Sequence, residues 1–111
     1  MEKTDFKEQV LYLTTIGRKS GAPRRIEIWF VERQGDVYLL TDDRNRSHWF
    51  RNVVANPSAT IEIGSRKWHA HGQVLDPETD TRLLDDVCRL AQEKYQWWSK
   101  NIIKFSLVEE T

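Results

Sequence analysis

The sequence predicts a mostly β protein of the α+β class: an antiparallel barrel of about six strands with a short helix and one longer C-terminal amphipathic helix. Three observations predict it. Short segments rich in β-branched and aromatic residues are separated by turn residues. Gln34-Gly35-Asp36 joins two such segments as a hairpin turn, and one later segment carries apolar residues at helical spacing. Closing these strands into a barrel would remove exposed sheet edges.

The strands are predicted where apolar residues cluster, or alternate with polar ones, between turn residues. In 24–33 the apolar side chains recur at every second position, which gives this strand one apolar face. The predicted strands are Val10–Thr15, Arg24–Arg33, Val37–Thr41, Ala59–Ile63, Lys67–Leu75 and Ile102–Val108.

Two helices are predicted between these strands. A short helix runs over His48–Ala55, with Ser47 as its N-cap and Asn56-Pro57 as its stop. In the longer helix Asp76 is the cap and Pro77 the first residue. Its apolar face is predicted to comprise Leu83, Leu84, Val87, Leu90, Ala91, Tyr95 and Trp98.

The composition excludes several classes of protein. A chain of 111 residues is one domain by size, so 1–111 is expected to be a single cofactor-binding unit. Seventeen Lys and Arg balance seventeen Asp and Glu, whereas non-specific nucleic-acid binding needs a basic excess. One cysteine, Cys88, excludes a disulfide framework. No metal is expected, because His69 and His71 lack a third ligand at a suitable spacing.

The chain also lacks the signals of export or membrane insertion. Its charged N-terminus contains no apolar segment of the kind found in signal peptides. No apolar run approaches the roughly 20 residues that a membrane-spanning helix needs. We therefore expect a cytoplasmic protein without an integral membrane segment.

A cationic loop is the first feature that could carry chemistry. Four cations fall within eight residues of a chain that has no net charge, and the loop's glycines let the backbone approach a ligand closely. An arginine can form two parallel bonds to a phosphate, and a lysine adds a point charge. This pattern indicates phosphate or carboxylate binding, or else a solvated, positively charged turn. The residues concerned are Gly17, Arg18, Lys19, Ser20, Gly21, Arg24 and Arg25.

Aromatic residues near the end of the longer helix are the second feature. Tyr95 and Trp98 are three residues apart and are expected on one helical face. They could pack in the core or form an aromatic surface for a planar ligand. Trp29, opposite the apolar face of its strand, needs a neighbour such as a ligand ring or the C-terminal helix. His48 is either a proton donor or a capping or packing residue.

Three blocks of the sequence resemble the deazaflavin-dependent nitroreductase family, which belongs to the flavin/deazaflavin oxidoreductases with a split β-barrel fold. The blocks are Leu13 to Arg24, Trp29 to Glu32, and His48 to Pro57. The resemblance runs from about Leu11 to Ile63 and is weaker beyond. The first block is specific to the family, while the Asn-Pro stop is shared by split-barrel proteins in general.

The resemblance implies coenzyme F420 as cofactor and assigns roles to the matching residues. Lys19, Ser20 and Arg24 would hold its phosphate, flanked by Arg18, Gly21 and Arg25. Trp49 and Asn52 would orient the cofactor, and the loop beginning Thr41-Asp42-Asp43 would lie along its ring. Trp29, Tyr95 and Trp98 would lie on the substrate side. The two aspartates depart from the family's smaller residues and would repel an anionic cofactor unless Arg44 or Arg46 neutralises them.

The function implied is that of an F420-dependent oxidoreductase. Reduced deazaflavin would transfer hydride to a small electrophilic acceptor such as a quinone, an enone or a nitroaromatic compound. Tyr95 and solvent are the two candidate proton donors, with solvent favoured. The alternatives are an FMN-binding split-barrel reductase, a carrier of a cofactor or lipid-like ligand, and a barrel with an accidental basic loop. A homodimer is a further expectation, since split barrels often pair through their barrel faces.

Overall fold

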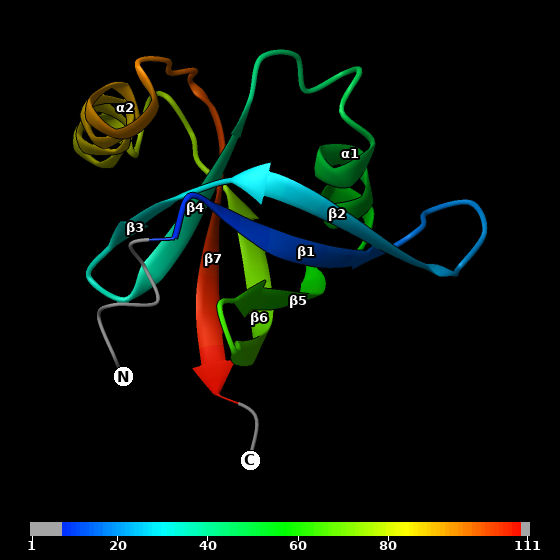
Figure 1. Cartoon of the computed structure of the whole chain (residues 1–111). Helices are drawn as coiled ribbons and strands as arrows, with labels where there is room; N and C mark the ends of the chain where they lie inside the picture. Colours follow the sequence, from blue (N-terminus) through cyan, green and yellow to red (C-terminus); the bar gives the residue numbers. More distant parts are fainter. Residues whose placement is uncertain (1–7, 110–111) are drawn as a thin grey trace.

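The computed structural model describes residues 8–109, and within them it contains seven strands and two helices (Figure 1). Their bounds are β1 Val10–Ile16, β2 Pro23–Trp29, β3 Val31–Arg33, β4 Asp36–Thr41, α1 His48–Ala55, β5 Ser58–Ile63, β6 Arg66–Val74, α2 Thr81–Tyr95 and β7 Asn101–Glu109. Every predicted strand segment contains a strand, and the mostly β, α+β split-barrel class is confirmed.

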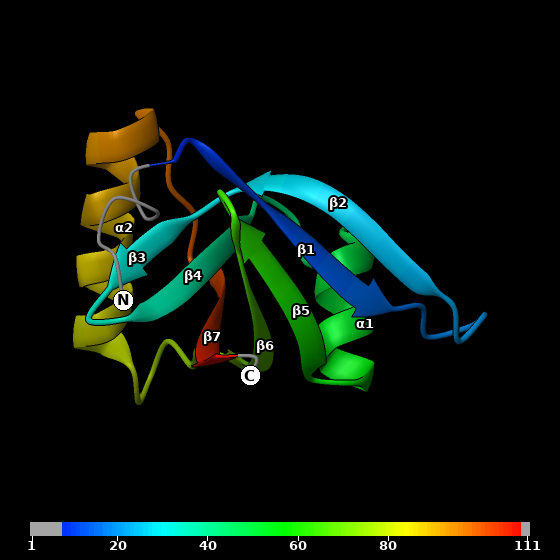
Figure 2. The same cartoon turned by 60° about the horizontal axis from the view of Figure 1, so that its bottom comes forward.

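The seven strands form one curled antiparallel sheet in the order β2-β1-β5-β6-β7-β4-β3. The strands at the two ends of this order, β2 and β3, are consecutive in the chain and only Phe30 separates them. The chain therefore passes directly from one edge of the sheet to the other, and the sheet curls around its own core (Figures 1 and 2).

The break at Phe30 is where the structure differs from the single strand predicted over Arg24–Arg33. The Phe30 amide donates to the Tyr95 hydroxyl at 3.0 Å, and its carbonyl accepts from Lys94 Nζ at 3.1 Å. Side chains from the last turn of α2 thus satisfy the backbone groups that a neighbouring strand would otherwise bind. The chain can change sheet edges at this residue without leaving a buried polar group unpaired.

Two apolar clusters form the core, one on each face of β4. One lies inside the sheet and includes side chains from β1, β4, β5, β6 and α1, with Leu11, Leu13, Leu39 and Ile61 fully buried. The other joins α2 to β3, β4 and β7. In both views α1 and α2 lie at opposite sides of the sheet (Figures 1 and 2). The helix α1 therefore stands against the side of the sheet where β1 and β2 end in the cationic loop.

Helix α1 has the predicted bounds, and Ser47 occupies the N-cap position without a side-chain capping bond. Helix α2 begins at Thr81, so the prediction that it starts at Pro77 is wrong. The Asp76 amide donates to Asp80 Oδ2 at 2.8 Å, and the Asp80 amide donates to the Asp76 carbonyl at 2.8 Å. These bonds close a separate turn over 77–79, which delays the helix.

The end of α2 also differs from the prediction. The helix stops at Tyr95, because Gln96 adopts the left-handed conformation with φ of 59°. Trp97 and Trp98 follow in an irregular segment. The prediction that Tyr95 and Trp98 share a helical face is therefore wrong. Within residues 8–109, no helix combines the length and the apolar character needed to cross a membrane.

Candidate functional site: a groove beside the edge of β2

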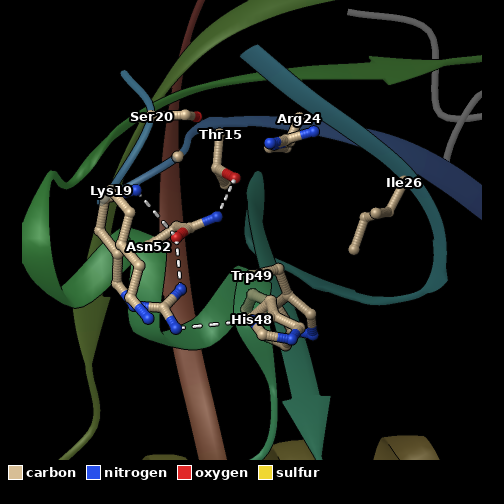
Figure 3. Close-up of a pocket in the computed structure, with 10 residues that line it drawn as sticks. Thr15, Lys19, Ser20, Arg24, Ile26, His48, Trp49 and Asn52 are labelled. Carbon is tan, nitrogen blue, oxygen red and sulfur yellow. Dashed lines mark hydrogen bonds between the residues drawn. The ribbon is translucent and has the colours of Figure 1, made fainter. Parts of the chain in front are cut away.

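A pocket of about 430 Å³ lies between β2, the loop after β1, and α1. Figure 3 shows side chains from all three segments around it. Because β2 stands at the end of the sheet order, its outer edge is open to this pocket instead of being paired with another strand. The lining residues are Thr15, Gly17, Arg18, Lys19, Ser20, Arg24, Ile26, His48, Trp49 and Asn52.

Asn52 connects the three segments that form the pocket. Its side chain is buried, with 4% of the residue exposed. The Asn52 Oδ1 accepts from the Arg18 amide at 3.2 Å and from Arg18 Nη1 at 2.8 Å, while its Nδ2 donates to Thr15 Oγ1 at 3.2 Å (Figure 3). Arg18 Nη2 also lies 3.5 Å from His48 Nδ1. This network holds the Arg18 guanidinium against α1 and fixes the start of the cationic loop.

The cationic loop is compact because two glycines allow it to fold back. At Gly17 an added Cβ would lie 2.7 Å from Ser20 Oγ, so a larger residue would displace the serine. Gly21 has φ of +72°, a conformation that favours glycine. The Gly17 amide donates to the Ala22 carbonyl and the Gly21 amide to the Gly17 carbonyl, both at 2.8 Å. The folded loop brings Lys19, Ser20 and Arg24 to one end of the pocket.

Two residues of the predicted phosphate site lie elsewhere. Arg25 pairs with Glu62 at 3.1 Å and lies 4.0 Å from the centre of the Tyr12 ring. Successive side chains of a strand point to opposite faces, so Arg25 faces away from the pocket that Arg24 lines. Gly21 shapes the turn and is exposed. The loop therefore contributes Arg18, Lys19, Ser20 and Arg24 to the pocket, but not Arg25.

A second depression of about 560 Å³ lies further along β2. Trp49 lines both, and we call the two together the groove. The first pocket is its cationic end and the second its aromatic end. The aromatic end is lined by Glu27, Ile28, Trp29, Leu40, Thr41, Asp42, Trp49 and Trp97. The predicted residues Thr41, Asp42 and Trp29 thus lie together at this end.

The two aspartates that depart from the family pattern have different surroundings. Asp43 accepts a bond from the Asn45 amide at 2.9 Å and pairs with Arg46 at 3.8 Å. Arg44 instead donates to Asn101 Oδ1 at 2.9 Å. Arg46 therefore offsets the charge of Asp43, whereas Asp42 is exposed at the aromatic end of the groove.

Tyr95 supports the groove from behind. Its ring stacks on Trp29, with centroids 4.4 Å apart and planes 4° apart. Its hydroxyl accepts from the Phe30 amide, and its single hydrogen lies within donating distance of two carbonyls, that of Phe30 at 2.9 Å and that of Gln9 at 2.7 Å. Burial raises the pKa of Tyr95, against a smaller opposite effect of the Phe30 backbone bond. These contacts give the hydroxyl a structural role at the corner between β2 and β3.

Trp98 is not brought to the groove. It is half-exposed and lines a separate depression with Cys88 and Arg89 on the outer side of α2. Trp97 takes the position at the aromatic end, where its ring meets Trp29 edge to face at 6.5 Å. Sequence reasoning did not assign Trp97 to the site, because a helix continued through 98 would have pointed this side chain away.

Two further lining residues of the cationic end, Thr15 and Ile26, were not predicted from the sequence. Gly17 of the cationic loop and His48 at the start of α1, which the sequence analysis had singled out, also line this end. A signal for Thr15 existed, since it ends a strand next to the cationic loop and faces the same side as the buried Leu11 and Leu13. No cluster of three or more His, Cys, Asp or Glu suited to a metal occurs among residues 8–109.

The fold and the groove define a split-barrel protein with a cationic pocket and, adjoining it at Trp49, an aromatic depression. Solved structures share this fold. An F420-H2-dependent reductase, FDR-A, superposes with a TM-score of 0.69 at 21% identity, covering 91% of this chain and 95% of that one. The heme storage protein HutZ of Vibrio cholerae superposes with a TM-score of 0.69 at 19% identity, covering 96% and 85%. At such identities the likeness establishes the fold alone.

Family membership comes from the sequence. The model of the F420H(2)-dependent quinone reductase family matches residues 2–109, and the chain therefore belongs to this family. The F420H(2)-dependent quinone reductase Rv1261c of Mycobacterium tuberculosis is 30% identical over 71 residues, which are 60% of this chain and 47% of that protein. The chain thus spans about half the length of the curated relatives it matches. The suspected flavin/deazaflavin oxidoreductase relationship is confirmed.

Proposed function

We propose that the chain binds coenzyme F420 in the groove and acts as an F420H2-dependent reductase of small planar acceptors, with quinones as the first class to test. One observation carries the proposal: the cationic pocket held by Asn52 adjoins an aromatic depression at Trp49, which lines both. F420 has the same two parts, a phosphate and a planar ring. The names of the family and of its mycobacterial relatives support this choice of cofactor and acceptor.

The residues at the cationic end fit a phosphate. Lys19 and Arg24 line the pocket, and neither forms an ion pair within residues 8–109. Ser20 adds a hydroxyl, which the lack of a Cβ at Gly17 leaves room for. We propose that Lys19, Ser20 and Arg24 bind the phosphate. Arg18 and Asn52 would position the loop, and Trp49 would contact the ring.

When bound, reduced F420 supplies a hydride from its ring carbon, and a proton completes the reduction of the acceptor. At the aromatic end, Trp29 and Trp97 would stack on the acceptor beside the ring. The Tyr95 hydroxyl is bonded to backbone groups and its pKa is raised, so it is a poor proton donor. We therefore propose that solvent supplies the proton. The role of Trp98 on the substrate side is not supported by its position in a separate depression.

Parallel titration of the purified protein with F420 and with FMN, followed by fluorescence, tests the cofactor. Tighter binding of F420, followed by oxidation of F420H2 on addition of a naphthoquinone, supports the proposal. Preferential binding of FMN would make the chain a flavin reductase. Binding of F420 without turnover of any quinone, enone or nitroaromatic acceptor would make it a carrier.

Three other expectations stay predictions: a cytoplasmic location, a single domain over 1–111 and a homodimer.

A further inference from the structure

The two ends of the groove differ in charge. The cationic end is lined by Arg18, Lys19 and Arg24. The aromatic end is lined by three tryptophans and two acidic residues, Glu27 and Asp42, and by no Lys or Arg of the described chain. Formal charge therefore changes sign along the groove, from positive near the loop to negative beyond Trp49. A ligand that reaches both ends therefore meets positive charge at one end and negative charge at the other.

The negative charge near the aromatic end is only partly offset. The Glu27 carboxylate accepts a bond from the neutral Tyr12 hydroxyl at 3.1 Å. Arg25, the nearest cation on that strand, shares its face of β2 with Glu27 and lies over the Tyr12 ring, but it is also paired with Glu62. On the other side Arg46 pairs with Asp43, and Arg44 donates to Asn101, which leaves Asp42 exposed at the groove. Both acidic residues line the aromatic end, so a ligand bound there meets negative charge.

The aromatic rings at this end favour a cation as well. The face of an indole attracts positive charge, and tryptophan does so most strongly among the aromatic side chains. Trp29 is held by its stack on Tyr95 and by its edge contact with Trp97, while 46% of the residue stays exposed. A fixed, partly exposed indole beside two carboxylates is suited to a flat ring that carries positive charge.

We propose that the aromatic end is a charge-selective acceptor site that prefers a positively charged planar acceptor over an anionic one of the same ring. The inference rests on the proposed function, because the ligand is an electron acceptor only if the chain is a reductase. The charge preference in binding is a property of the groove itself. It names the specificity-determining residues as Glu27 and Asp42, with Trp29 as the stacking surface. Acceptors with sulfonate or carboxylate substituents are predicted to be poor substrates, because the same carboxylates repel them.

Binding is tested first, without cofactor. The ligand pair is (naphthalen-2-yl)trimethylammonium and its neutral isostere 2-tert-butylnaphthalene, followed by quenching of tryptophan fluorescence. We expect the cation to bind about tenfold more tightly at low salt, and Glu27→Gln and Asp42→Asn each to remove about threefold of that preference, as for exposed ion pairs. High salt should reduce the preference in the wild type. The control is Glu78→Gln, the same charge change in the turn before α2.

Turnover is tested second, with the F420-loaded protein and naphthoquinones that carry either a trimethylammonium or a sulfonate group. A higher kcat/KM for the cationic quinone, lost in the Glu27→Gln plus Asp42→Asn protein, supports the inference. Equal kcat/KM for both quinones would overturn it and leave the reductase function standing. Charge-selective binding without turnover of either quinone would overturn the reductase function and leave the charge-selective site standing. Equal binding of the cation and its isostere in the wild type would overturn the site itself.

Discussion

The ring of Tyr95 lies parallel to the indole of Trp29, 4.4 Å between centroids, while its hydroxyl binds the backbone of the next residue, Phe30. The last residue of α2 therefore orients an aromatic side chain of the groove and completes the corner at which the chain changes sheet edges. Because both contacts come from one side chain, the stacking surface and the barrel corner are coupled.

Tyr95→Phe separates these two contributions. The phenyl ring can keep the stack on Trp29, but the buried Phe30 amide loses its acceptor. An unsatisfied buried donor costs about 1–3 kcal/mol, and each kcal/mol lowers the Tm of a domain of this size by about 4–8 °C. A thermal melt should show this fall. Tyr12→Phe removes a hydroxyl bonded to the exposed Glu27 and should leave the Tm nearly unchanged; equal Tm values for the two variants would contradict the assignment.

Much of the fold follows from local pattern, and the differences from the prediction have two causes, one long-range and one local. Alternation and turn residues located all six strand segments and the helix α1. The break at Phe30 depends on side chains more than sixty residues away in the chain, so no local pattern reveals it. The late start of α2 depends on the bonds between Asp76 and Asp80, which compete with the first helical turn.

The candidate site was predictable to the extent that its residues are close in sequence. Lys19, Ser20 and Arg24 meet as expected because one loop carries them. That Trp97 and not Trp98 lines the aromatic end could not be predicted, because it follows from the left-handed conformation of Gln96, which ends the helix. The position of Arg25 outside the pocket could have been predicted, because strand alternation places its side chain on the face opposite that of Arg24.

The ammonium of Lys94 should make stability depend on pH. Burial lowers its pKa to about 8 from the ordinary 10.5. Between these values the unfolded chain binds more protons than the folded one, so the free energy of unfolding rises with pH over this window and loses that contribution as pH falls through about 8. Denaturant unfolding of the wild type and of Lys94→Met at pH 7 to 9.5 measures it.

We expect the stability of the wild type to rise relative to that of Lys94→Met across this pH range. The control is Lys100→Met, which removes an exposed lysine in the segment after α2. Its free energy of unfolding should change with pH in the same way as that of the wild type. Parallel curves for Lys94→Met and the wild type would show that the Phe30 carbonyl and ring, which contact the ammonium, offset the cost of burial.

Replacing Lys19 and Arg24, which form no ion pair with the described residues 8–109, should weaken cofactor binding without unfolding the protein. A charge-assisted hydrogen bond contributes about 1.5–3 kcal/mol, so Lys19→Ala with Arg24→Ala should weaken F420 binding at least tenfold, with little change in Tm. The control is Arg25→Ala with Lys67→Ala, which removes the same charge from exposed positions that do not line the groove. Titration of both double variants with F420 measures the two affinities. An equal loss of affinity in both would mean that F420 binding depends only on the net charge of the protein.

Asn52→Ala should affect both stability and binding. The change removes both bonds to Arg18 and leaves the buried Thr15 hydroxyl without this partner. We expect a loss of about 1–3 kcal/mol in the free energy of unfolding and a weaker affinity for F420, because the loop that carries Lys19 is no longer held. Asn45→Ala, at an exposed loop position, should change neither quantity. An intact affinity in Asn52→Ala would show that the loop holds its shape through its own backbone bonds.

Trp29 and Trp98 provide a matched pair for the acceptor side, since 46% and 50% of these residues are exposed. Trp29 lines the groove and stacks on Tyr95, whereas Trp98 lines the depression beside Cys88. Trp29→Ala should raise the KM for a naphthoquinone several-fold and leave F420 affinity nearly intact. The lost stack contributes about 0.5–1.5 kcal/mol, so its Tm should fall only modestly. Trp98→Ala should leave both KM and F420 affinity unchanged. A raised KM in Trp98→Ala alone would move the acceptor to the outer side of α2, away from the groove.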